Sequence, residues 1–144
     1  METVAGAIKH HPSLFAYDIK NEPDLDFENI GQNEVKNWLE FTINRLKTYD
    51  PDHLITIGWS QPEVANELDE LVDFISFHFY RKPTELNDFL LKKELKDLPI
   101  FVGEIGMHSF NSWWHPFGKS QAEQAAHVEP VSYTHLMLPT ILLV

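Results

Sequence analysis

Hydrophobic and polar residues alternate along the chain with two different periods. Four short runs, rich in β-branched and aromatic residues, either alternate with period two or are continuously apolar, which predicts strands. They cover residues 14–21, 53–59, 73–80 and 99–105. Between and after them, segments with apolar residues every three to four positions, or with helix-start signals, predict helices. These segments are residues 31–49, 62–71, 83–90 and a stretch that begins at Ser120. Strands separated by helices predict parallel βαβ units and therefore an α/β fold.

The two faces of the second and third predicted strands differ in chemistry. One face is bulky and apolar, and it carries Ile55, Ile57, Trp59, Ile75, Phe77 and Phe79. The other becomes polar toward the carboxyl end, with Thr56, Gly58, Ser60, Ser76, His78 and Tyr80. A doubly wound sheet would favour continuous apolar runs, so a closed barrel with a polar mouth fits this pattern better. We therefore expect a partial TIM (β/α)8 barrel, with about four of the eight βα units.

The composition is that of an ordinary globular chain, with 144 residues, 43% hydrophobic residues and a net charge of −11. The absence of cysteine excludes a thiol nucleophile and cysteine-ligated zinc. No basic patch stands out and no apolar run reaches the roughly 18 residues of a membrane span, so neither nucleic acid nor a membrane is an expected partner. Of the eight histidines, only His78 and His108 fall near the expected barrel mouth, so we expect no metal site. Localisation and oligomeric state stay open.

The last fourteen residues differ from the rest. All charged residues precede position 131, and the segment 131–144, VSYTHLMLPTILLV, contains none. Its first ten residues resemble a translated transposon adapter from DNA library preparation, with Met137 as the one departure. We therefore expect residues 131–144 to be a non-native tail, and the protein itself to continue differently beyond Pro130. The alternative is a genuine apolar C-terminal strand.

A glutamate stands near the predicted carboxyl end of two strands. Glu22 closes the first strand in an Asn-Glu-Pro sequence, and Glu104 lies in the last strand in Val-Gly-Glu-Ile-Gly. In a barrel, both would face the pocket at the carboxyl ends of the strands. Two facing carboxyls can hydrolyse a glycosidic bond if one is held protonated as an acid and the other is ionised as a nucleophile.

The segments Leu14 to Pro23 and Ile100 to Gly106 resemble the fourth and seventh strands of retaining (β/α)8-barrel glycoside hydrolases. The resemblance is closest to glycoside hydrolase family 5, the cellulase family that also holds endo-mannanases and exo-glucosidases. It runs from about Ala5 to Glu129, so that residues 1–130 form a partial catalytic barrel of strands four to seven. Strands one to three and eight are absent, and we expect the isolated chain to have little or no turnover.

The resemblance implies a role for each matching residue. Glu22 would be the acid/base and Glu104 the nucleophile, while Asn21 would hydrogen-bond the sugar 2-hydroxyl. His78 and Tyr80 match a His-x-Tyr sequence at the end of strand six, in which the tyrosine sits against the nucleophile. The implied activity is retaining, endo-β-1,4-glucanase-like hydrolysis of a β-linked glycan without a cofactor. The alternatives are a β-mannanase or another relative of the same clan, or an inactive carbohydrate-binding fragment.

Aromatic and charged residues near the expected pocket give further candidates. Trp59, Trp113 and Trp114 are candidate sugar platforms, because aromatic faces pack on the apolar faces of pyranose rings; Trp59 could equally pack beneath a helix. Asp18 and Lys20 share a strand face with Glu22 by period two, and we interpret them as a structural ion pair.

Overall fold

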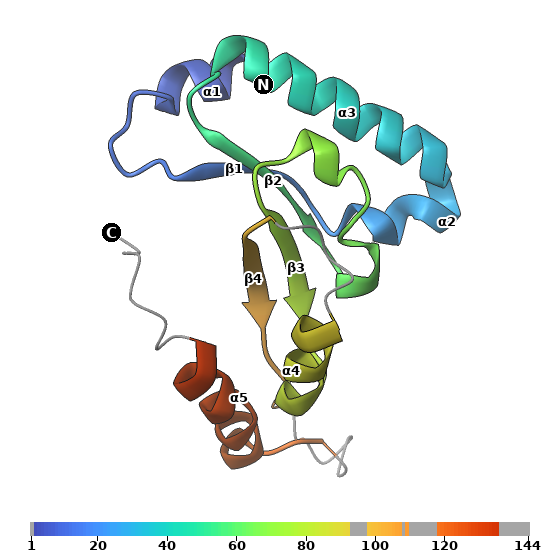
Figure 1. Ribbon diagram of the computed structural model, residues 1–144, viewed down its shortest axis with the longest axis vertical. Helices are drawn as coiled ribbons and strands as arrows, with labels where there is room; N and C mark the ends of the chain where they lie inside the picture. The colour runs from blue at the N-terminus through green and yellow to red at the C-terminus, as the bar shows by residue number, and fades with distance from the viewer. Residues whose placement is uncertain (1, 93–97, 108, 110–117, 136–144) are drawn as a thin grey trace. The chain divides into compact units, whose positions relative to one another are not determined.

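The computed structural model describes residues 2–92, 98–107, 109 and 118–135. They fall into two compact units. The first comprises residues 2–78 and 98–103, and the second comprises the described residues of 79–94 and 104–144. The helices are α1 (Glu2–Ile8), α2 (Phe27–Ile30), α3 (Gln32–Tyr49), α4 (Pro83–Lys92) and α5 (Gln121–His135), and the strands are β1 (Ala16–Asn21), β2 (Leu54–Trp59), β3 (Ile75–Phe79) and β4 (Ile100–Ile105) (Figure 1).

The strands form one sheet in the order β1-β2-β3-β4. The pairs β1/β2 and β2/β3 are parallel, with Ala16 opposite Leu54 and Gly58 opposite Ser76. Figure 1 shows β3 and β4 running in the same direction. Each strand therefore lies beside its sequence neighbour, with helical segments in the connections. This arrangement confirms the predicted α/β fold, with strand positions within about two residues of those expected from the sequence.

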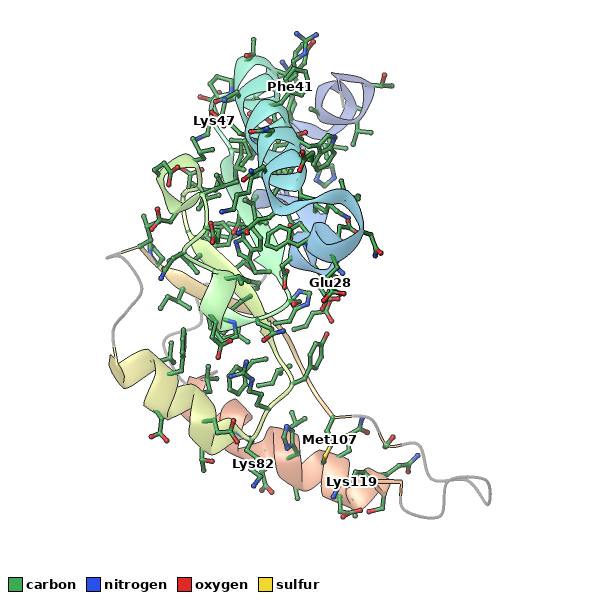
Figure 2. All side chains as sticks on the ribbon, turned by 90° about the vertical axis from the view of Figure 1, so that its right-hand side faces the viewer. Glu28, Phe41, Lys47, Lys82, Met107 and Lys119 are labelled. Atoms are coloured by element: carbon green, nitrogen blue, oxygen red, sulfur yellow. The ribbon has the colours of Figure 1, made fainter. Side chains whose placement is uncertain are left out.

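The core of the first unit lies between α3 and the sheet. Helix α3 contacts β1 and lies beside α1 (Figure 1). It buries one stripe of side chains at helical spacing: Val35, Leu39, Thr42, Ile43 and Leu46. On its open side Phe41 is 67% exposed, while Lys47 reaches the Leu71 carbonyl oxygen at 2.8 Å (Figure 2). The apolar spacing thus predicted this helix and most of the face that it buries. It also placed Trp38 in the core, and this prediction is wrong, because Trp38 is 48% exposed.

Strands β2 and β3 are buried on both faces. Ile55 to Trp59 and all five residues of β3 are buried, including the polar side chains of Thr56, Ser76 and His78. The Thr56 hydroxyl donates to the Phe74 carbonyl oxygen at 2.8 Å, which satisfies one of these buried polar groups. The part of the polar face that lies within β2 and β3 is therefore buried, whereas Tyr80, just beyond β3, is 51% exposed.

Several short segments differ from the sequence-based expectation. The segment from residue 62 to 71 forms two short 3-10 helices, Pro62–Val64 and Asp69–Leu71, instead of one helix. The interruption lies at Leu68, whose φ of 60° is left-handed and incompatible with a continuous right-handed helix. Helix α1, helix α2 and the 3-10 helix Pro23–Asp26 were not predicted. Helix α5 continues to His135, so its last five residues belong to the segment that we interpret as non-native.

A buried carboxylate joins helix α3 to the strands that flank it. Asp50, which ends α3, is 3% exposed. It accepts a hydrogen bond from the Tyr17 hydroxyl at 2.8 Å, and its Oδ2 lies 2.8 Å from His53 Nδ1. Burial acts to raise the pKa of Asp50, but these bonds and the backbone N–H groups of Asp52 and His53 outweigh it and lower that pKa to about 2. Desolvation, followed by the same contact with Asp50, raises the pKa of Tyr17 to about 12.

The free energy of unfolding should therefore fall in acid because of Asp50. A carboxylate with a lowered folded-state pKa stabilises the fold above its unfolded value of 3.8, and this contribution is lost as the pH falls toward about 2. The shift corresponds to about 2 kcal/mol. Urea unfolding between pH 6 and pH 2 should show this loss, and the Asp50→Asn variant should show a flatter profile. The matched control Asp52→Asn keeps its backbone N–H and should retain the wild-type profile; equal flattening by both variants would contradict the assignment.

Candidate active site

The first candidate carboxylate, Glu22, directly follows strand β1. Its backbone is left-handed, with φ 47° and ψ 52°, a conformation that costs free energy for a residue other than glycine. Its N–H donates to the Gly58 carbonyl oxygen at 2.6 Å, and the buried Pro23 begins the next 3-10 helix. The chain thus turns sharply at Glu22, and tertiary contacts maintain the turn.

The side chain of Glu22 contacts His78 near the end of β3. Its Oε1 lies 2.7 Å from His78 Nδ1, and the two side chains are 22% and 3% exposed. Gly103 in β4 lies beside this pair: a Cβ there would make a tight contact of 3.2 Å with Ser76 Oγ and an ordinary contact of 3.5 Å with the imidazole Cδ2. Three strands, β1, β3 and β4, therefore determine the surroundings of this pair. We expected His78 to bind substrate. Because its side chain is buried, it has little surface for a ligand, and its contact is with Glu22.

The second candidate carboxylate, Glu104, belongs to the second unit. Its Oε2 accepts a hydrogen bond from the Tyr80 hydroxyl. Glu104 is exposed and Tyr80 is 51% exposed, so both side chains are open to a ligand. The resemblance implied a tyrosine against the nucleophile, and the structure contains this contact.

Asp18 and Lys20 do not pair with each other, and the expected ion pair is wrong. Asp18 Oδ1 accepts hydrogen bonds from the Gly58 N–H at 2.9 Å and the Lys20 N–H at 3.3 Å. The Lys20 ammonium pairs with Asp26 instead, at 2.9 Å. The reason is local: the register of β1 against β2 shifts between Asp18 and Asn21, so the strict alternation that we assumed does not hold.

The Asp18 carboxylate lies over the backbone of strand β2. A side chain at Gly58 would overlap the carboxylate, so this approach requires glycine. Although Asp18 is open to solvent on one side, the strands around it partly desolvate the carboxylate and raise its pKa, while the N–H groups of Gly58 and Lys20 and the nearby His78 act in the opposite direction. The end of β2 is therefore a close neighbour of both Asp18 and Glu22.

The remaining predicted ligand-binding residues differ in their exposure to solvent. Asn21 is exposed at the end of β1, opposite Gly58. Trp59 is 2% exposed and packs edge-on against Phe27, so it has no open face for a sugar; its interpretation as a platform is wrong and it is a core residue. Trp113 and Trp114 lie outside the described residues.

Two contacts of this region were not anticipated from the sequence. These are the Glu22–His78 pair and the bonds from Ser60 to Asp24. The available signal was the presence of polar residues at or just beyond the carboxyl ends of β1, β2 and β3, but sequence periodicity does not say which of these residues meet. Within the ranges that the structure describes, no cluster of three or more His, Cys, Asp or Glu side chains could hold a metal ion. Likewise, none of the helices described is long and apolar enough to cross a bilayer.

Comparisons with known proteins found a similar enzyme sequence and a similar solved structure. The chain is 24% identical over 128 residues to mannan endo-1,4-beta-mannosidase F of Aspergillus clavatus, an alignment that covers 85% of the chain and 27% of that protein. It is similar to the apo structure of a b-glucuronidase from Ruminococcus gnavus with a TM-score of 0.63 and 21% identity, over 89% of the chain and 24% of that structure. This second likeness concerns the fold, and it confirms the prediction of part of a TIM barrel. The chain thus spans about a quarter of the length of these proteins.

The model of the cellulase family, glycosyl hydrolase family 5, matches residues 1–136. This match includes both candidate glutamates and every described residue. The chain belongs to glycosyl hydrolase family 5.

Proposed function

We propose that the chain forms strands four to seven of a retaining β-glycosidase barrel, with Glu22 as acid/base and Glu104 as nucleophile. The observation that carries this proposal is the hydrogen bond from the Tyr80 hydroxyl to Glu104, since it joins a strand-end glutamate to the aromatic partner expected of a nucleophile. The contact of Glu22 with His78 supports the assignment of Glu22 as the acid/base. A carboxylate with a fixed hydrogen-bond partner is oriented for proton transfer.

The proposed reaction proceeds in two displacements. In the first, a Glu104 oxygen attacks the anomeric carbon while Glu22 donates its proton to the departing glycosidic oxygen. In the second, Glu22 removes a proton from water, the water oxygen attacks the anomeric carbon, and the Glu104 carboxylate leaves. Tyr80 and His78 orient the two carboxyl groups, and Asn21 hydrogen-bonds the sugar 2-hydroxyl. Trp113 and Trp114 are proposed sugar platforms.

The proposed substrate is a β-1,4-linked glucan cut at internal bonds. A second candidate, β-1,4-mannan, is favoured by the similarity to an enzyme named as a mannan endo-1,4-beta-mannosidase. Glucose and mannose differ in the orientation of the 2-hydroxyl, the group assigned to Asn21. The choice between these substrates therefore depends on groups around that position.

The test uses the enzyme expressed from the complete reading frame that contains residues 1–130. Soluble β-1,4-glucan and β-1,4-mannan are supplied separately, and proton NMR follows the anomeric configuration of the first product. We expect β-configured reducing ends from one of the two polymers, because double displacement retains configuration. An α-configured first product, or no hydrolysis of any β-linked glycan, would contradict the proposal. Sugar binding without hydrolysis would instead favour the carbohydrate-binding alternative.

A further inference from the structure

We propose that Asp24 is a positioning residue for Glu22, because its carboxylate ties the chain just after Glu22 to the end of strand β2. This inference rests on the proposed function, in which Glu22 is the acid/base. It concerns a residue that does not itself touch the sugar. It follows from contacts within the first unit alone.

Both oxygens of the Asp24 carboxylate bind the same residue. Asp24 Oδ1 accepts a hydrogen bond from the Ser60 N–H at 2.9 Å, and Oδ2 accepts one from the Ser60 hydroxyl. Ser60 directly follows strand β2. Two bonds to one carboxylate determine its orientation as well as its distance, and hydrogen bonds to an ionised acceptor are stronger than neutral ones.

A second anchor holds the chain to the same end of β2, two residues before Asp24. There the Glu22 N–H donates to the Gly58 carbonyl oxygen at 2.6 Å. Between the two anchors Glu22 holds its left-handed backbone with φ 47°. Such a conformation persists only where the surroundings enforce it, so releasing Asp24 would let the turn relax.

Relaxation of the turn would move the carboxyl group of Glu22. That group lies 2.7 Å from His78 Nδ1, a distance that a change in the Glu22 backbone angles would not preserve. A displaced acid protonates the leaving oxygen less effectively, whereas attack by Glu104 does not depend on this contact. The loss should therefore grow with the basicity of the leaving group. A merely structural role of Asp24 would reduce the rates of all substrates alike.

The chain provides a matched control two residues further on. Asp26 belongs to the same 3-10 helix, but its carboxylate pairs with the Lys20 ammonium of β1 at 2.9 Å instead of with Ser60. Asp26→Ala therefore removes an equally sized acidic side chain from the same segment and leaves the Ser60 anchor in place.

The experiment measures kcat/KM of the complete barrel enzyme on aryl β-glycosides, since kcat/KM reports the first displacement. A dinitrophenyl glycoside needs little acid assistance and an unsubstituted phenyl glycoside needs much more. For Asp24→Ala we expect a loss of about 100-fold on the phenyl glycoside and less than about threefold on the dinitrophenyl glycoside. Ser60→Ala, which keeps the backbone N–H, and Asp24→Asn, which keeps one acceptor, should show smaller losses with the same dependence. Asp26→Ala should match the wild type.

Equal losses on both glycosides, or wild-type rates for Asp24→Ala, would overturn the proposal. If Asp24→Ala fails to fold, the ratio of the two rates in Ser60→Ala decides in the same way. Glu22→Ala is measured in the same series to distinguish a failure of the Asp24 role from a failure of the proposed function. If Glu22→Ala lacks the dependence on the leaving group, the proposed function itself fails. If Glu22→Ala shows it and the Asp24 and Ser60 variants do not, only the role of Asp24 fails.

Discussion

Replacing Glu104 by Gln in the complete barrel enzyme should lower kcat by at least about 10⁴-fold, because the amide cannot form the glycosyl-enzyme intermediate. The fold should be unaffected, since Glu104 is exposed and the amide can still accept the bond from Tyr80. The matched control is Glu28→Gln, because Glu28 is an exposed glutamate on α2 (Figure 2). Activity on a soluble β-glucan or β-mannan and the thermal unfolding temperature are measured for both variants.

The product formed with azide identifies the role of Glu104. In Glu104→Gly, azide can enter the space of the missing carboxylate and attack the anomeric carbon from the same side, while Glu22 still protonates the leaving group. The expected product is an α-glycosyl azide, which NMR distinguishes from its β anomer. Wild-type turnover in Glu104→Gln, or a β-glycosyl azide from Glu104→Gly, would remove Glu104 from the nucleophile position.

Replacing Glu22 by Ala should lower kcat/KM by about 10²–10⁴-fold on substrates with poor leaving groups, which is the range of general acid catalysis. The effect should be much smaller on a dinitrophenyl glycoside. With that substrate the glycosyl-enzyme forms but lacks a base to activate water, so added azide should accelerate turnover. Because azide then attacks from the side of Glu22, the product should be a β-glycosyl azide. An α product, or no acceleration by azide, would contradict the acid/base assignment, and Glu28→Gln is again the control.

The periodic pattern predicted the fold closely where burial repeats regularly. Helix α3 was predicted from its apolar stripe, and β2 and β3 from their short β-branched and aromatic runs. The pattern was misleading where one residue changes the backbone. Leu68, with its positive φ, divides the expected helix over residues 62–71, and the register shift after Asp18 separates that residue from the expected partner Lys20. Such local departures depend on tertiary contacts and leave no periodic signal.

From the sequence came the candidate site residues and, through the resemblance, the contact of Tyr80 with Glu104, but not the partner of Glu22. Glu22 and Glu104 were identified because each is an acidic residue near the carboxyl end of a strand, where barrel pockets form. The partner of Glu22 could not be identified in the same way, since His78 lies 56 residues away along the chain. Trp59 illustrates the opposite error: its position near the pocket suggested a sugar platform, but it is buried at 2% exposure.

The order of the four strands and of helices α3, α4 and α5, and the choice of the two candidate glutamates, follow from the sequence by itself, because each depends on the local spacing of residue types. Which side chains meet was decided only by tertiary structure. The bonds of His78 to Glu22 and of Ser60 to Asp24 join residues at or just beyond the ends of different strands with residues far away along the chain, and their partners depend on strand register. The left-handed turn at Glu22 belongs to the same class, since no local preference of glutamate favours it and only the contacts across the sheet maintain it.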